Sequence, residues 1–121
     1  MTKKYTQNTL DPSIQWKAIG VDLAKYDNTV VAVSQDGEVQ HIERISTDEL
    51  LKLASELKPT TFAIEPCNGA NLLSLALQKH HEVKTISGEA VKNWVKVHCG
   101  GQKTDRNDAM ALAFLSLDAM P

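Results

Sequence analysis

Three strand-like segments follow one another early in the chain, before any helical pattern begins. They are Trp16 to Ala24, the β-branched segment Asn28 to Ser34, and Val39 to Ile45. Between the second and the third lies Asp36-Gly37, a pair that favours a tight hairpin. Since consecutive strands joined by short turns pair antiparallel, we predict that the domain opens as a three-stranded antiparallel meander.

A helical pattern follows the third segment. Ser46 and Glu49 have the spacing of a capping box, and Lys58-Pro59 ends the pattern. Between these signals apolar residues recur at helical spacing: Leu50, Leu53, Ala54 and Leu57. We predict an amphipathic helix here.

Short strands then alternate with helices. The strand-like segments are Thr60 to Glu65 and Val83 to Ile86, and Ser87 is a plausible cap for the helix after the second one. A last helix begins near Asp105 and runs towards Leu117. Because strands separated by crossover helices lie parallel, both should join the opening sheet. The order predicts an α/β domain with a ribonuclease H-like mixed sheet, three antiparallel strands followed by two parallel strands, and flanking helices.

Length and composition limit the remaining possibilities. The 121 residues fit one domain: residues 1–15, polar and without period, are expected to form a flexible N-terminal arm, and residues 16–121 the domain. The net charge of −2 means that nucleic-acid contacts must come from local basic patches. Cys67 and Cys99 have neither zinc-site nor disulfide spacing, and no apolar run reaches the length of a membrane span. We expect a cytoplasmic protein.

Four acidic residues are the candidates for chemistry. Asp22 and Glu65 stand at the ends of strand-like segments, and Asp105 and Asp108 are one helical turn apart, so they share a helix face. Crowded carboxylates are costly unless they are protonated or paired, and Mg²⁺ prefers oxygen ligands while keeping room for water and phosphate oxygens. Two such ions about 4 Å apart can promote an in-line displacement at phosphorus.

Structural roles explain each acid taken alone. Asp105 fits an N-cap with Asp108 at the third helical position, both stabilised by the helix dipole. Asp22 fits a turn residue and Glu65 a solvated one. Only the four together favour a metal site.

The residues around the acids point to a known family. Ile-Gly-Val-Asp-Leu-Ala-Lys at 19–25, Ile-Glu-Pro-Cys-Asn-Gly-Ala at 64–70 and Lys-Thr-Asp-Arg-Asn-Asp-Ala at 103–109 resemble the N-terminal domain of the DEDD transposases, the insertion-sequence family that includes the pilin-gene invertase Piv. The resemblance covers nearly everything from Lys17 to Leu117, and the third motif is the most specific.

This resemblance implies a function and a fold. By position, the family's four catalytic, metal-binding acids correspond to Asp22, Glu65, Asp105 and Asp108, with Mg²⁺ or Mn²⁺ as cofactor. The implied activity is metal-dependent DNA strand cleavage and joining in transposition or site-specific recombination, on a fold similar to that of the junction resolvase RuvC. Implied partners are DNA at element ends or junctions, a structured guide RNA, and other copies of the full-length protein.

Two departures limit the analogy. The family continues into a C-terminal domain with a serine that takes part in strand exchange, whereas this chain stops at Pro121. We therefore expect a fragment that does not complete transposition alone. Ser87-Gly88 stands where many relatives have a proline-containing turn, which affects the local loop.

Basic side chains near the third motif are candidates for DNA binding, because phosphate contacts supply sequence-independent affinity. They are Lys92, Lys96, Lys103 and Arg106, for which solvated surface positions are the alternative. The four histidines form no metal-ligand pattern. Trp94 lies on an apolar helix face and is expected in the core rather than stacked on a base.

Other functions remain open at this stage. A RuvC-like junction-resolving nuclease would use the same acids on branched DNA. A non-catalytic DNA-binding or dimerisation remnant would not use them. An actin-like ATP-binding domain also has an aspartate after Ile-Gly, but its phosphate loop is rich in Gly, Ser or Thr where Leu23 to Tyr26 stand here.

Overall fold

Five strands and four helices make up the domain in a computed structural model that describes residues 9–67 and 69–118. In chain order they are β1 (Trp16–Asp22), β2 (Asn28–Ser34), β3 (Val39–Ile45), α1 (Thr47–Glu56), β4 (Thr61–Ile64), α2 (Ala70–Leu77), β5 (Glu82–Thr85), α3 (Gly88–His98) and α4 (Asp105–Asp118). The strands form a single sheet in the order β3-β2-β1-β4-β5. The first three pair antiparallel, whereas β4 lies parallel to β1 and β5 parallel to β4. The predicted ribonuclease H-like mixed sheet is confirmed.

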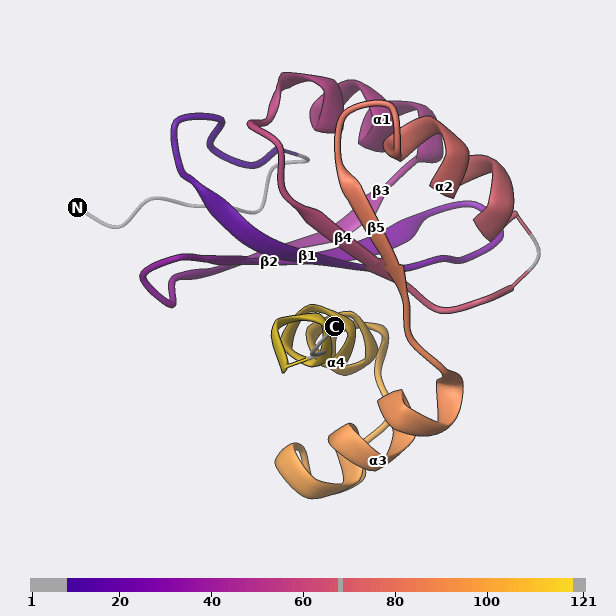
Figure 1. The fold of residues 1–121 in the computed structure, drawn as a ribbon. Coiled ribbons are helices and arrows are strands. Elements are labelled where there is room, and N and C mark those ends of the chain that lie inside the picture. The colour runs from indigo at the N-terminus through magenta and orange to yellow at the C-terminus, as the bar shows by residue number, and fades with distance from the viewer. Residues whose placement is uncertain (1–8, 68, 119–121) are drawn as a thin grey trace.

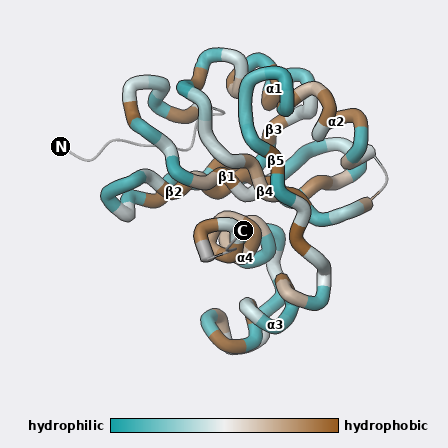
Figure 2. Tube along the Cα trace, in the orientation of Figure 1, coloured by the Kyte–Doolittle hydropathy of each residue, from teal (hydrophilic) through white to brown (hydrophobic). Residues whose placement is uncertain are grey.

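Helices cover both faces of this sheet. In Figure 1, α1 and α2 lie on one face, while α4 crosses the other face with α3 beside it. Strand β2 shows the consequence, because all seven of its residues are buried. Its alternate residues point to opposite faces: Val30 packs in the core under α1 and α2, and Val31 in the core under α4. The strands in the middle of the sheet are correspondingly hydrophobic, and the β2–β3 turn is hydrophilic (Figure 2).

Local signals act as the sequence predicts. The capping box of α1 forms, with the Ser46 side chain accepting from the Glu49 amide at 3.1 Å and the Glu49 carboxylate accepting from the Ser46 amide at 3.2 Å. The β2–β3 hairpin also forms, but Gly37 alone adopts a positive φ, of 86°. A two-residue type I′ turn needs positive φ at both positions, so the turn is of another kind. It is closed by the Ser34 amide, which donates to the Glu38 carbonyl at 2.8 Å.

The position of α4 depends on a glycine in β1. A Cβ atom on Gly20 would overlap the carbonyl oxygen of Ala109 and lie 2.7 Å from the amide nitrogen of Ala113. Glycine within a strand often marks such a close backbone approach. The alanines on the facing side of α4 are fully buried. Because α4 lies directly on β1, its N-terminal turn is held close to the end of that strand.

The predicted N-terminal arm requires a correction. Residues 1–8 lie outside the described residues, and residues 9–15 form no strand or helix. Leu10, however, is only 2% exposed within the core, and Ile14 packs against the same cluster. The Trp16 indole also donates to the Asp11 carbonyl at 3.1 Å. Residues 9–15 are therefore docked on the domain, because an apolar side chain in this otherwise polar stretch finds a place in the core.

Two smaller findings concern the thiols and membrane insertion. Both cysteines are free; Cys67 is exposed and Cys99 is partly buried. Within the described part of the chain, no helix combines the length and the apolar character that crossing a membrane requires.

Candidate metal and nucleic-acid site

Neighbouring strands bring the first two acids to the same edge of the sheet. Asp22 is the last residue of β1, and Glu65 directly follows β4. The two strands are parallel and Val21 is paired with Ile64, so Asp22 and Glu65, which follow this pair, lie at the same edge of the sheet. The glycine-dependent docking of α4 places Asp105 and Asp108 in the first helical turn near this edge.

The N-terminus of α4 is capped by Thr104, which removes one structural explanation for the acids. The Asn107 amide donates to Thr104 Oγ1 at 3.0 Å, and the Asp108 amide donates to the Thr104 carbonyl at 3.0 Å. The alternative in which Asp105 is the N-cap is therefore wrong, since the threonine before it takes that role. The Asp105 side chain is exposed, and Asp108 is 7% exposed.

Asp22 experiences the strongest electrostatic perturbation of the acids. Its pKa is raised from 3.8 to about 7, mainly by burial, then by a hydrogen bond with the Asp105 side chain and by the charges of Asp105 and Asp108. The charge of Lys103 acts to lower the pKa of Asp22. Such a pKa means that Asp22 is partly protonated near neutral pH, because burial and the neighbouring carboxylates disfavour its ionised form.

A cation already lies beside the acids. The ammonium group of Lys103 contacts Asp108 Oδ2 at 2.7 Å. The pKa of Lys103 is raised, first by this hydrogen bond and the Asp108 charge, and further by Asp22 and Glu65. One positive charge is thus stabilised by three of the four acids. An oxygen-only donor set that stabilises a cation and crowds its own carboxylates is chemically suited to Mg²⁺ or Mn²⁺.

The acids are not arranged as a finished metal site. Among residues 9–67 and 69–118, no group of three or more His, Cys, Asp or Glu side chains has a geometry that could hold a metal ion. Asp108 is paired with Lys103, and Asp22 with Asp105. The assignment of the four acids as metal ligands stays a prediction.

Glu65 has a contact that the sequence did not reveal. A Cβ atom on Gly88, the first residue of α3, would lie 2.7 Å from Glu65 Oε2. The Ser87 side chain caps α3 as predicted, accepting from the Ala90 amide at 3.1 Å. The departure at Ser87-Gly88 therefore leaves room for the Glu65 carboxylate. No pattern in the sequence connects these residues, because their contact depends on how β4 and α3 meet.

The predicted DNA-binding residues fall into two places. Lys92, Lys96 and Lys103 line one cavity of about 540 Å³ together with Glu65 and Asp108. Arg106 lines a different cavity, which also contains Asp105. The structure thus brings three of the four cations to one side of the acids and puts Arg106 on another.

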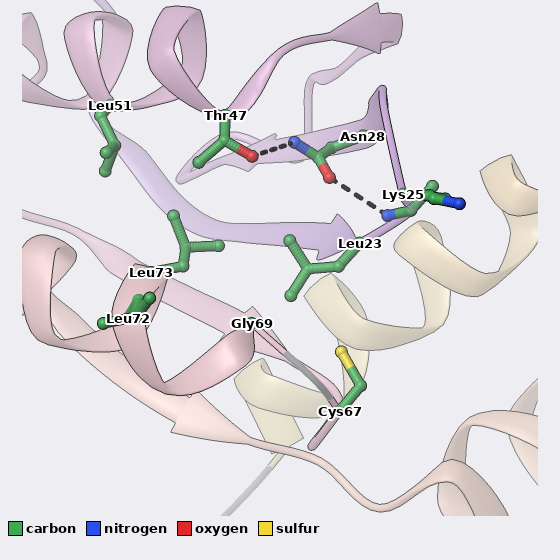
Figure 3. Close-up of a pocket in the computed structure, with 10 residues that line it drawn as sticks. Leu23, Lys25, Asn28, Thr47, Leu51, Cys67, Gly69, Leu72 and Leu73 are labelled. Carbon is green, nitrogen blue, oxygen red and sulfur yellow. Dashed lines mark hydrogen bonds between the residues drawn. The ribbon is translucent and has the colours of Figure 1, made fainter.

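A third pocket, of about 680 Å³, lies between α1, α2 and the loop after β1, and contains none of the four acids (Figure 3). Leucine side chains surround it, among them Leu23, Leu51 and Leu73. Its polar lining residues include Lys25, Asn28 and Thr47. Asn28 is buried, and its side chain is already bonded: its amide nitrogen donates to the Ile45 carbonyl, and its oxygen accepts from the Ala24 amide, both at 3.2 Å.

The remaining aromatic and histidine assignments are structural. His81 is 6% exposed; its Nδ1 accepts from the Thr60 amide at 3.1 Å, so Nε2 carries the proton and donates to the Ala54 carbonyl at 2.7 Å. Burial, above all, lowers the pKa of His81, in agreement with this neutral form. Trp94 is partly buried and stacks on Phe114 with ring centroids 5.8 Å apart, as expected for a core position.

The strand order and the acids at the carboxyl ends of β1 and β4 define a ribonuclease H-like domain with a carboxylate-rich edge. The family model of the IS110-type DEDD transposases, described as a transposase, matches residues 19–120, and the chain belongs to this family.

A curated relative is the transposase for insertion sequence element IS1111A of Coxiella burnetii (strain RSA 493 / Nine Mile phase I). The two sequences are 29% identical over 102 residues, which is 80% of this chain and 26% of the relative. The chain therefore spans about a quarter of that relative's length.

Proposed function

We propose that this domain carries the catalytic acids for metal-dependent cleavage and joining of DNA strands during transposition or site-specific recombination. The observation that carries the proposal is the burial of Asp22 beside Asp105 and Asp108, because burial and these two carboxylates together raise the pKa of Asp22 to about 7. Burying carboxylates close together costs free energy. In a transposase-family domain, a bound cation that neutralises them would account for this arrangement.

The four acids would hold Mg²⁺ or Mn²⁺, with Asp22 as the central ligand and Glu65, Asp105 and Asp108 around it. The bound ions would supply activation of an attacking oxygen, from water or a DNA 3′-hydroxyl, and stabilisation of the oxygen that leaves phosphorus. Lys103 has a separate role in this scheme. Its ammonium group neutralises Asp108 in the absence of metal and is free to contact a phosphate once the acid binds the ion.

DNA would approach along the cavity that contains Lys92, Lys96 and Lys103. The net charge of −2 gives the domain no general attraction for a polyanion, so these cations must act locally. The partners implied by the family belong to the same proposal: DNA at element ends or junctions, a structured guide RNA, and further copies of the full-length protein.

Metal binding is the first test. We expect isothermal titration with Mn²⁺ to show binding by the wild-type chain and its loss in Asp22→Asn, which removes the charge but preserves size. Asp48→Asn, an exposed position in α1, is the matched control and should bind like wild type. Equal binding by wild type and Asp22→Asn would show that the proposed site is wrong.

DNA substrates then separate the two nuclease functions. A junction-resolving nuclease would cut branched DNA in preference to linear DNA and would leave the products unjoined, whereas the proposed function requires joined products. DNA binding that is unaffected by metal and by Asp22→Asn, without cleavage, would instead favour a non-catalytic binding module.

A further inference from the structure

A second polar cavity lies on the Asp105 side of the carboxylates. Its volume is about 720 Å³, and it is formed between β2, β3 and the residues around the start of α4. Its lining includes His41, Glu43, Arg44, Gln102, Asp105 and Arg106. Asp105 lies in this cavity, while Asp108 and Glu65 line the lysine cavity, so the acids stand between two hollows.

Two guanidinium groups in the second cavity are free to meet a ligand, and a buried histidine nitrogen beside them is unpaired among the described residues. Arg44 and Arg106 form no ion pair within residues 9–67 and 69–118. The Nε2 atom of His41 is buried and has no hydrogen-bond partner among those residues. Burial and the nearby Arg106 charge lower the pKa of His41, whereas Glu43 on its own strand acts to raise it.

The wall formed by the start of α4 is held in place by hydrogen bonds. The Asn107 side chain donates to the Gln102 carbonyl at 2.9 Å, and the Asn107 amide donates to Thr104 Oγ1 at 3.0 Å. On the opposite wall, Thr29 Oγ1 donates to the Glu43 carbonyl at 3.2 Å. A cavity with fixed walls and unpaired groups is preorganised for binding.

The mixture of charges indicates what kind of ligand fits. Three carboxylates accompany the two guanidinium groups, contributed by Asp27, Glu43 and Asp105, so an anion alone is not favoured here. A nucleotide has both a phosphate and a base edge that offers donors and acceptors. Arg and Gln side chains are the groups that pair with such edges, and Glu accepts from a cytosine amino group.

We propose that this cavity receives one nucleotide of the DNA strand, beside the phosphate that is cut, and contacts the edge of its base. The inference rests on the proposed function for the adjacency to the cut phosphate, but the cavity itself does not depend on it. Arg44 and Gln102 face the base edge, and Arg106 faces the phosphate. The consequence is a preference for particular bases next to the cleavage point.

The test uses the 121-residue chain and nuclear magnetic resonance. The four deoxynucleoside 5′-monophosphates and inorganic phosphate are titrated separately, and backbone amide shifts are followed. We expect saturable shifts at His41, Arg44 and Gln102 with the nucleotides, affinities that differ between bases, and little response to phosphate. Arg44→Ala should weaken binding of the preferred nucleotide about fivefold. Lys52 is exposed on α1, and Lys52→Ala should leave this affinity unchanged.

Three outcomes would overturn the proposal: equal shifts with inorganic phosphate, shifts confined to the lysine cavity, or equal affinity in Arg44→Ala. The last is informative because Arg44 is exposed on β3, and folding of the variant is checked in the same spectra. The Mn²⁺ titration is independent of these readings. If the wild-type chain binds no Mn²⁺ but shows the nucleotide shifts, the proposed function is contradicted and the nucleotide cavity stands. If it binds Mn²⁺ but shows no nucleotide shifts, the cavity alone is contradicted.

Discussion

At the scale of single residues, the carboxyl group of Asp22 is held partly protonated at neutral pH by its neighbours. Its pKa of about 7 arises from burial and from Asp105 and Asp108, against the opposing effect of Lys103. A group with this pKa responds both to pH and to any cation that replaces the proton. The same residue therefore connects the stability of the fold to the proposed chemistry.

This connection predicts a pH dependence of stability. Because the pKa of Asp22 is higher in the folded chain than its usual 3.8, the protonated group favours folding. That contribution is complete below about pH 4 and is lost as the pH rises through about 7. We expect urea unfolding of metal-free protein to show that Asp22→Asn loses less stability than wild type between about pH 5 and about pH 8. Asp48→Asn should lose as much stability over this pH range as wild type. If Asp22→Asn also loses as much as wild type, the raised pKa of Asp22 is contradicted.

Gly88 provides a second test at this scale. In Gly88→Ala the new Cβ would meet Glu65 Oε2 at 2.7 Å, and the flexible carboxylate must turn away. Alanine suits a helix better than glycine, so stability should be unchanged or slightly higher. Affinity for Mn²⁺, measured by calorimetry, should fall about tenfold if Glu65 is a ligand. Wild-type affinity in this variant would argue that Glu65 lies outside the site.

At the scale of secondary-structure elements, helix α4 determines whether the acids meet. It carries two of them and rests on β1 at Gly20. Its contacts spread around the helix: Ala109 and Ala113 pack under β1 and β2, whereas Ala111 and Leu112 pack in the cluster with α3. A helix buried on two sides has no single apolar face.

That distribution explains which parts of the structure could be predicted. The strands and α1 could be predicted from the spacing of apolar residues, the capping box and the Asp-Gly turn. The four acids were proposed from their sequence motifs. The docking of α4 was missed, although Gly20 in the middle of a strand was an available signal. The second cavity joins His41 and Arg44 on β3 to Arg106 on α4, far apart in sequence, and no local pattern reports such a contact.

Gly20→Ala tests the docking of α4. Its Cβ would press on the backbone of Ala109 and Ala113, which cannot turn aside as a side chain does. We expect a loss of about 1 to 3 kcal/mol in the free energy of unfolding by urea. Gly88→Ala, the same change where only a flexible side chain is in the way, is the matched control. Wild-type stability in Gly20→Ala would contradict the close approach.

At the scale of the whole molecule, charge is arranged locally rather than globally. The chain has a net charge of −2, but its cations flank the carboxylates: three lysines line one cavity and two arginines line the other. Nucleic acid bound across both would contact cations on each side of the acids. The chain matches about a quarter of the length of its IS1111A relative.

Thermal unfolding with and without Mn²⁺, at about pH 8, tests the central claim most directly. Without metal, Asp22→Asn should melt at a higher temperature than wild type, because the variant lacks a charge that burial and the neighbouring carboxylates disfavour. With Mn²⁺ at a hundred times its dissociation constant, the free energy of unfolding of wild type should rise by about 2.7 kcal/mol, while that of the variant should hardly change. The two melting temperatures should therefore converge or change order. An equal rise in both proteins would contradict a metal site centred on Asp22.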